Sequence, residues 1–385
     1  MPSGLRTVVK RTLIVLNIIT AFFYLLSALA PYVKPTSFWF ISLLGLAFPV
    51  LLLLLTAFIF IWLILKWRVL WFSLIILLIG YKSISVIFGF HTPARFNYDK
   101  KPKQIRIASW NVARFLEWKR NDNERSKIRL KILEEINKQD PDIICLQEFF
   151  HSPDPRFYNN ISEIKEMGYP YHYFSYDPDG EHQYIGAAIF SKFPMIDTGL
   201  VRYFRPSMPE ALVHADIKAG EDTIRVFTTH LQSVQFRKRD YDAINEITNA
   251  EDSFFTNSKT VLAKLKKAMK YRSTQADVVR QILDDSPYPV VFCGDLNDVP
   301  NSHTYFTIRG SMQDAFLKKG FGIGRTYSSL SPTLRIDYIF TDEHFRIIQF
   351  TRVVKYLSDH FMLMADIEIP SSPSVPAKAG PKRGH

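Results

Sequence analysis

The stretch Val290–Pro300, VVFCGDLNDVP, contains the residue types that most clearly suggest chemistry. An apolar run typical of a buried β-strand ends in Asp295, and Asn297 follows with one residue between them. Alternate residues of an extended chain share one side, so the carboxylate and the amide are expected to face the same substrate atom. A strand followed by an Asp-rich turn is also a common structural feature, and this stretch alone leaves both interpretations open.

Five more stretches place polar side chains within or at the end of an apolar strand-like run. They are RIASWNV (106–112), DIICLQEF (142–149), RVFTTHLQS (225–233), LRIDYIF (334–340) and LSDHFML (357–363), and they contribute Asn111, Glu148, His230, Asp337, and Asp359 with His360. A polar group in such a run is costly to bury without a partner. The recurrence of this pattern predicts one shared site.

In this order, WNV, QE, THL, GDLND, RIDYIF and SDH resemble the motif series of the endonuclease/exonuclease/phosphatase superfamily. That superfamily includes deoxyribonuclease I, apurinic/apyrimidinic endonucleases, neutral sphingomyelinases and inositol polyphosphate 5-phosphatases. The resemblance spans roughly residues 105–369 and implies a deoxyribonuclease I-like, four-layer α/β sandwich. The irregular mixture of strand-like and helical segments also indicates two stacked sheets with helices outside.

The resemblance implies a divalent metal ion, Mg²⁺ or Mn²⁺, held mainly by Glu148. These hard cations prefer oxygen ligands and retain several waters, which suits a carboxylate. Asn111 and Asp359 are expected to complete or orient the metal shell. As structural alternatives, Asp359 and its neighbour His360 could merely cap a strand.

The remaining site residues are expected to act on the phosphate ester and the attacking water. His230 and His360 can hydrogen-bond phosphoryl oxygens or transfer protons near neutral pH. The resemblance pairs His360 with Asp337, assigns Asp295 to the water, and lets Asn297 donate to the phosphate. Because no activated Ser or Cys accompanies this set, direct attack by water is expected rather than a covalent intermediate.

One partner remains open in the sequence. In deoxyribonuclease I a glutamate just before the middle strand pairs with the first histidine. The matching stretch here is GEHQYIGAAIFSK, which offers Glu181, Gln183 and Tyr184.

The first 91 residues are overwhelmingly apolar and are expected to be a membrane anchor. Three segments, 13–32, 38–65 and 69–90, each reach the ~20 residues that a spanning helix needs. The N-terminal tail and residues 66–68 are basic, so both segments are expected in the cytoplasm. Three spans then put the following domain on the extracytoplasmic side of the membrane. If the first segment is instead a cleaved signal peptide, with Ala28–Leu29–Ala30 as the cleavage site, the domain faces the same side.

After the anchor we expect a linker at 92–104, the hydrolase domain at 105–369 and a disordered, Pro- and Ser-rich tail at 370–385. The net charge of +11 partly reflects the cations that flank the apolar segments. Basic groups at 237–239 and 264–270 are candidates for contacts with a nucleic-acid backbone, although a run such as KLKKAMKYR is usually a solvated helix face.

The expected substrate is a phosphate ester, and the expected enzyme is a phosphodiesterase or nuclease. The alternative is a sphingomyelinase-like phosphohydrolase of lipids or inositol phosphates, because an anchor beside the lipid bilayer gives access to a high local concentration of head groups. A non-catalytic membrane binding module is a third interpretation. The presence of His230, His360 and Glu148 speaks against this third interpretation, because a binding module does not need these residues.

Overall fold

The structure is a computed structural model that describes residues 3–92, 94–116, 128–203, 210–236 and 254–369. The chain divides into two compact units. The helical unit comprises Met1–Phe88, Ser233–Thr274 and Val299–Thr307, and the sandwich unit comprises Gly89–Gln232, Gln275–Asp298 and Ile308–His385. The predicted tail at 370–385 and the basic group at 237–239 lie outside the described residues.

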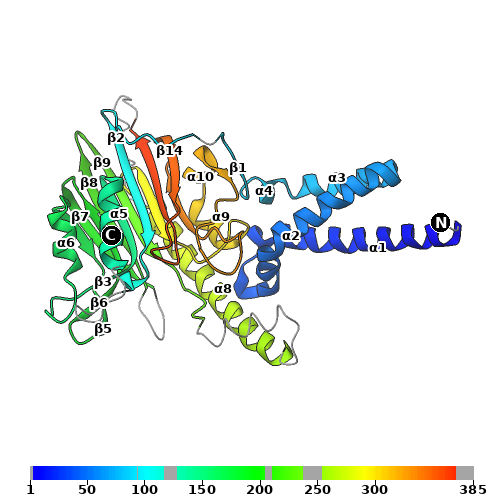
Figure 1. Ribbon diagram of the computed structural model, residues 1–385, viewed down its shortest axis with the longest axis horizontal. Helices are drawn as coiled ribbons and strands as arrows, with labels where there is room; N and C mark the ends of the chain where they lie inside the picture. Colours follow the sequence, from blue (N-terminus) through cyan, green and yellow to red (C-terminus); the bar gives the residue numbers. More distant parts are fainter. Residues whose placement is uncertain (1–2, 93, 117–127, 204–209, 237–253, 370–385) are drawn as a thin grey trace, which may run out of the picture. The chain divides into compact units, whose positions relative to one another are not determined.

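The sandwich unit contains two large mixed sheets (Figure 1). The seven-stranded sheet has the order β14 (Arg346–Val353), β15 (Met362–Glu368), β2 (Gln104–Asn111), β3 (Ile143–His151), β6 (Gln183–Ser191) and β4 (Tyr171–Phe174), with β5 (Asp177–Gly180) also paired to β6. The six-stranded sheet has the order β11 (Gln313–Asp314), β13 (Asp337–Thr341), β10 (Val290–Asp295), β9 (Asp222–His230), β8 (Ala211–Ala219) and β7 (Met195–Arg202). A small third sheet pairs β1 (Gly89–Phe90) with β12 (Phe321–Gly322).

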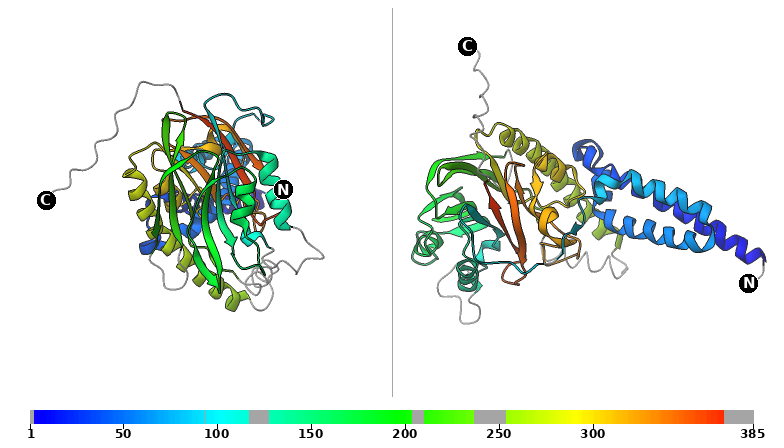
Figure 2. Two further views of the ribbon diagram at one scale, coloured as in Figure 1. Left: turned by 90° about the vertical axis from the view of Figure 1, so that its left-hand side faces the viewer. Right: turned by 90° about the horizontal axis from the view of Figure 1, so that it is seen from above.

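The two large sheets pack face to face (Figure 2). One buried apolar cluster draws residues from both sheets, among them Ile107 and Ile189 from one and Val226 and Ile339 from the other. The central strands β2 and β3 pair in parallel, as do β9 and β10, and their apolar runs suit burial on both faces. The predicted α/β sandwich is therefore confirmed.

Two helices cover the outer face of the seven-stranded sheet. In α5 (Ile128–Gln139), the apolar residues Ile132, Leu133 and Ile136 recur at helical spacing and are buried against that sheet. α6 (Asn160–Glu166) begins after Asn159, whose side chain accepts a hydrogen bond from the Ser162 amide. The other helical segments among the described residues after residue 89 are η2 (Ala113–Phe115), α8 (Phe254–Asp284), α9 (His303–Arg309) and α10 (Ala315–Lys319). Most of α8 and of α9 belongs to the helical unit.

The helical unit begins with α1 (Ser3–Ala28), η1 (Ala30–Tyr32) and α2 (Pro35–Leu65). Segments Gly4–Tyr32 and Pro35–Leu65 are each long and apolar enough to cross a membrane. The third predicted span is instead split into α3 (Trp67–Ile79) and the short α4 (Tyr81–Ile84). The split falls at Gly80, where an added Cβ would lie 2.0 Å from the Tyr24 hydroxyl oxygen, so this close approach requires glycine.

Side-chain hydrogen bonds set the direction of this third segment. Asn17 Nδ2 donates to Ser73 Oγ at 2.9 Å, the Tyr24 hydroxyl to the Leu77 carbonyl at 3.1 Å, and Ser83 Oγ to the Ala28 carbonyl at 3.4 Å. Residues further along α1 bond to residues further along α3 and α4. The α3–α4 segment therefore runs in the same direction as α1. Together they extend about 27 Å at 1.5 Å per residue, close to the ~30 Å of a bilayer core.

Candidate active site

Three strand termini of the six-stranded sheet bring polar side chains side by side. In the strand register, Asp295 at the end of β10 lies opposite His230 on β9 and opposite Asp337 on β13. Strands β9 and β10 are parallel and end at the same edge, while the antiparallel β13 begins there. Three residues that are far apart in sequence therefore meet at one edge of the sheet.

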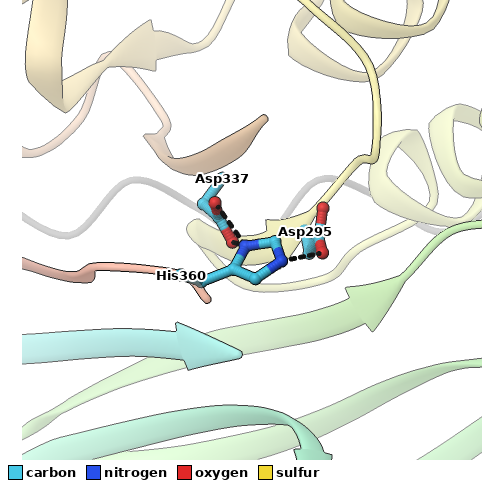
Figure 3. Close-up of side chains that lie close together, drawn as sticks. All are labelled: Asp295, Asp337 and His360. Atoms are coloured by element: carbon cyan, nitrogen blue, oxygen red, sulfur yellow. Dashed lines mark hydrogen bonds and ion pairs between the residues drawn. The ribbon is translucent and has the colours of Figure 1, made fainter. Parts of the chain in front are cut away.

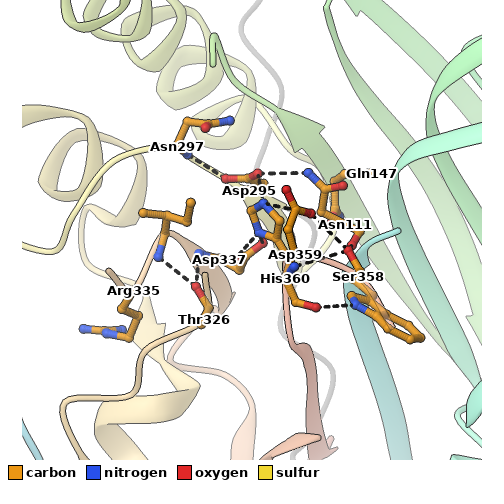
Figure 4. Close-up of polar contacts among 12 residues, drawn as sticks. Asn111, Gln147, Asp295, Asn297, Thr326, Arg335, Asp337, Ser358, Asp359 and His360 are labelled. Carbon is orange, nitrogen blue, oxygen red and sulfur yellow. Dashed lines mark hydrogen bonds and ion pairs between the residues drawn. The ribbon is translucent and has the colours of Figure 1, made fainter. Parts of the chain in front are cut away.

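The seven-stranded sheet brings its own group to the same site. Asn111 ends β2 opposite Gln147 of β3, and Glu148 follows. At Glu148 the backbone takes φ +48°, and the β3–β6 register shifts between Leu146 and Phe149. Such a bulge redirects a side chain relative to the pleat. Asp359 and His360 arrive from the segment just before β15 (Figure 4).

His360 forms a buried pair with Asp337 across the two sheets (Figure 3). Its Nδ1 lies 2.9 Å from Oδ2 and 3.1 Å from Oδ1 of Asp337, and its Nε2 lies 3.6 Å from Oδ2 of Asp295. Burial by itself lowers the pKa of His360, but the charges of Asp337 and Asp295 outweigh it and raise that pKa to about 10. At neutral pH the imidazole is therefore protonated and directs an Nε2–H donor toward Asp295.

Asp295 is fully buried and receives hydrogen bonds from two directions. The Asn297 backbone amide donates to Oδ1 at 2.7 Å, and Asn111 Nδ2 donates to Oδ2 at 3.1 Å. Burial, assisted by the charge of Asp337, raises the pKa of Asp295 to about 6, although the two histidines act in the opposite direction. Such a carboxylate is mostly ionised at pH 7 and is basic enough to take a proton from water.

His230 lies against a second carboxylate, Glu210. The His230 Nδ1 is 3.7 Å from Oε2 of Glu210, and its Nε2 is 3.6 Å from Oδ2 of Asp295 and 3.7 Å from Oε1 of Glu148. Burial lowers the pKa of His230, but these three carboxylates outweigh it and the net shift is upward. The partner that the sequence left open among Glu181, Gln183 and Tyr184 is thus Glu210, just before β8, in a region that no motif marks.

Asn297 reaches the site by a turn rather than by extended backbone. Strand β10 ends at Asp295, and Asn297 has φ +50°, so the expected strand-like alternation of the two side chains is wrong. The bond from the Asn297 amide to the Asp295 side chain is an Asx-type turn that holds this shape. The Asn297 Nδ2 lies 2.9 Å from His230 Nε2 and donates to the Leu231 carbonyl at 3.0 Å.

Two of the three predicted metal-binding side chains are the most open part of the site, while the third, Asn111, is buried. The Glu148 side chain is 32% exposed and that of Asp359 is 48% exposed, whereas Asp295 and Asp337 are almost completely buried. Burial raises the pKa of Asp359 and the negative charge of Glu148 adds to this, although His360 lowers it. Two neighbouring carboxylates on an open side suit a hard divalent cation.

Asn111 orients this group. Its Nδ2 lies 3.4 Å from Oε1 of Glu148, while its Oδ1 accepts from the Ala113 amide. Among the described residues, the ligand atoms of Asp295, Asp337 and His360 also lie within 4.8 Å of one another. A protonated His360 has no free lone pair for a metal, so these three fit proton transfer and hydrogen bonding better.

Comparisons with known proteins find similarity in both the N-terminal part and the later part of the chain. A model of the Endonuclease/Exonuclease/phosphatase family matches residues 108–360, and a model of a domain of unknown function matches residues 10–87. A DNA-(apurinic or apyrimidinic site) endonuclease of Dictyostelium discoideum is 32% identical over 89 residues, 23% of this chain and 20% of that protein. This chain thus spans about a fifth of that relative's length.

Similar solved structures include an endonuclease/exonuclease/phosphatase from Beutenbergia cavernae, with 18% identity, a TM-score of 0.49 and coverage of 71% of this chain and 73% of that one. The human Nocturnin catalytic domain with bound sulfate has 19% identity, a TM-score of 0.49 and coverage of 70% and 95%. A humanized D. rerio TDP2 has 17% identity, a TM-score of 0.49 and coverage of 69% and 99%. Because the family model covers well over half of the sequence, the chain belongs to the Endonuclease/Exonuclease/phosphatase family.

Proposed function

We propose that this protein is a membrane-anchored, divalent-metal-dependent phosphoric ester hydrolase that acts by direct attack of water, as a phosphodiesterase or nuclease. The observation that carries the proposal is the position of Asp295 between two histidines. Its Oδ2 lies 3.6 Å from the Nε2 atoms of both His230 and His360. A basic carboxylate flanked by two histidines with raised pKa suits activation of water beside a charged phosphate.

In this proposal Asp295 accepts the proton of the attacking water. His360 and His230 donate hydrogen bonds to phosphoryl oxygens, and Asp337 and Glu210 raise the pKa of the two imidazoles and orient them. Asn297, whose Nδ2 lies 2.9 Å from His230 Nε2, also donates to the phosphate in this proposal. Mg²⁺ or Mn²⁺ held by Glu148 and Asp359, with Asn111 orienting Glu148, would supply neutralisation of the phosphoryl and leaving oxygens.

A nucleic-acid substrate is supported by the curated relative, which is named a DNA endonuclease. The second candidate is hydrolysis of phospholipids or inositol phosphates. Two helices long and apolar enough to cross a membrane favour it, because they would hold the site beside lipid head groups.

We also propose that the sandwich unit is extracytoplasmic. Lys66 and Arg68 lie at the opposite end of α2 from the α1–α2 turn, and basic flanks of this kind stay in the cytoplasm. The parallel course of α1 and the α3–α4 segment supports an odd number of crossings.

The test is hydrolysis by the full chain purified in detergent, with bis-p-nitrophenyl phosphate, plasmid DNA, sphingomyelin and inositol phosphates compared with and without Mg²⁺. His360→Ala is expected to lower the rate on the true substrate by at least about 100-fold. Glu148→Gln is expected to raise the Mg²⁺ concentration needed for activity. The exposed His91 and Glu343 provide the matched controls His91→Ala and Glu343→Gln.

Cleavage of DNA that His360→Ala abolishes supports the nuclease assignment, and cleavage confined to lipid or inositol substrates supports the alternative. Activity that survives both site variants would reject the site. No hydrolysis of any substrate would favour the binding-module interpretation.

A further inference from the structure

The N-terminal half of α8 presents a one-sided row of lysines. Lys259, Lys266, Lys267 and Lys270 stand at positions i, i+7, i+8 and i+11, which share one face of an α-helix, and all four are exposed or half-buried. This set is called the lysine face here. The opposite side is buried, through Ala268, Arg272 and Gln275. The helix is thus packed on one side and open on the other.

The lysine face has no internal counter-charge among the described residues. The sequence contains no Asp or Glu from 253 to 276, and no ion pair joins these four lysines to a described acidic group. Lys266 and Lys270 are four residues apart, and Lys267 and Lys270 three apart, spacings at which like charges destabilise a helix. An anion from outside the chain would relieve this repulsion.

Aromatic contacts place this part of α8 beside one end of the apolar helices. The Lys266 Nζ lies 5.2 Å from the ring centroid of Trp39, near the start of α2. At the same end, Lys82 of α4 lies 5.0 Å from the Tyr32 ring and 5.5 Å from the Phe306 ring. Lysines beside Trp and Tyr at the end of apolar helices are characteristic of the membrane–water interface.

A buried hydrogen bond fastens a further segment to this end. Asn301, 1% exposed, donates from Nδ2 to the carbonyl of Ser27 at 2.9 Å, near the C-terminus of α1. Gly45 of α2 leaves no room there, since an added Cβ would lie 2.6 Å from the Asn301 carbonyl oxygen and 2.9 Å from the Ala30 Cβ. The helix ends, the 299–307 segment and the part of α8 up to Thr274 therefore form one packed unit around the turn between α1 and α2.

We propose that the lysine face binds the head groups of anionic phospholipids in the leaflet next to the α1–α2 turn. The proposal rests on the membrane anchoring stated under the proposed function, and it adds a lipid requirement that the hydrolase chemistry does not contain. Phe38 and Phe40, 53% and 45% exposed beside Trp39, suit insertion among lipids more than contact with a nucleic-acid backbone. Lipid phosphates at that level would lie within reach of flexible lysine side chains.

The test is native mass spectrometry of the full chain in detergent, without Mg²⁺, mixed with equal amounts of phosphatidylglycerol and phosphatidylcholine. The wild-type chain is expected to retain phosphatidylglycerol several-fold over phosphatidylcholine. Replacing Lys259, Lys266, Lys267 and Lys270 by Gln together is expected to remove that preference. The matched control replaces four exposed lysines of the sandwich unit, Lys131, Lys138, Lys318 and Lys319, by Gln and is expected to keep it.

A preference that survives in the lysine-face variant, or that is lost equally in the control, would overturn the proposal. A single-stranded oligonucleotide added as competitor gives a second readout. Its displacement of phosphatidylglycerol from both the wild-type chain and the control, whose lysine face is intact, would assign the face to nucleic acid instead.

Lipid retention does not depend on hydrolysis, so an inactive enzyme leaves this test intact. Release of the chain from membranes by a high-salt wash without detergent would instead reject the anchoring on which the proposal rests. Helical circular dichroism of the variants shows whether α8 remains folded.

Discussion

At the scale of single residues, the site is organised by two carboxylate–imidazole pairs around Asp295. Asp337 holds His360 at hydrogen-bond distance, whereas Glu210 and His230 are 3.7 Å apart. Burial would favour neutral imidazoles, and only the neighbouring carboxylates reverse this. The protonation of each histidine is thus a property of its partner, and it should change when that partner is neutralised.

Asp337→Asn is expected to lower the pKa of His360 from about 10 toward its ordinary value of 6.5, because the amide carries no charge. The rate of hydrolysis near neutral pH should fall about 100-fold as the imidazole loses its proton and its orientation. Titration of the His360 ring proton by NMR in metal-free protein measures the change. Asp222→Asn, at an exposed position, is the control, and an unchanged His360 pKa would contradict the prediction.

The same pair predicts how stability depends on pH. When a histidine has a higher pKa in the folded than in the unfolded protein, its protonation stabilises the fold. This contribution is complete below the pKa of the unfolded state and is lost as the pH rises through the pKa of the folded state. For His360 the loss falls between pH 6.5 and about pH 10. The melting temperature of the wild-type protein should fall over that pH range. The melting temperature of Asp337→Asn should depend less on pH over the same range.

Glu210→Gln is expected to lower the pKa of His230 by less than Asp337→Asn lowers that of His360. Asp295 and Glu148 still raise the His230 pKa after this change, and the pair is separated by 3.7 Å. The rate should fall about tenfold, with the pH profile shifted to lower pH. A His230 titration that does not move would show that Glu210 has no electrostatic role.

At the level of elements, the strand ends supply only part of the site. Two local departures from regular strand backbone complete it. Glu148 and Asn297 both have positive φ, at +48° and +50°. The first lies in a register shift of β3 and the second in the turn after β10. Both distortions direct polar side chains toward the edge where the two sheets meet, at the cost of backbone conformations that most residues avoid.

Comparing Asn297→Gly with Asn297→Ala separates the role of the Asn297 side chain beside His230 from the role of its positive-φ backbone. Both variants remove the amide beside His230, so both should lose activity to a similar degree. Glycine accepts positive φ freely, whereas alanine does not, so Asn297→Ala should be less stable than Asn297→Gly by about 1 kcal/mol. Thermal unfolding in detergent measures this difference, and equal melting temperatures would argue against backbone strain at this position.

At the scale of the whole molecule, the helical unit is not a simple N-terminal segment. It includes Ser233–Thr274 and Val299–Thr307, which come from within the family domain matched at residues 108–360. The second of these segments begins four residues after Asp295. The chain therefore passes directly from the candidate active site into the unit that holds the apolar helices.

Cysteine labelling tests the proposed topology. Both native cysteines, Cys145 and Cys293, are buried, so an introduced cysteine provides the signal. A membrane-impermeant maleimide should label Ser37→Cys in intact cells and leave Lys66→Cys unlabelled until the membrane is opened. The reverse pattern would place the sandwich unit in the cytoplasm.

Much of this protein can be predicted from local sequence. Polar interruptions of apolar strands identify the residues that the structure gathers at one edge, and the central strands are recognisable because both of their faces are apolar. Strands β7 and β14 are difficult to recognise from local sequence. Each lies at an end of its sheet and is largely half-exposed, so it lacks a continuous apolar run.

The fold class, the family and the long apolar helices can be predicted from the amino-acid sequence, because each follows from short-range patterns or ordered motifs. Which side chains meet in the site depends on the tertiary structure. The approach of Glu210 to His230, the turn that delivers Asn297, and the return of α3 and α4 alongside α1 depend on strand pairing and helix packing between distant segments. Local sequence patterns do not predict such contacts, because the contacts form only when the sheets and helices pack together.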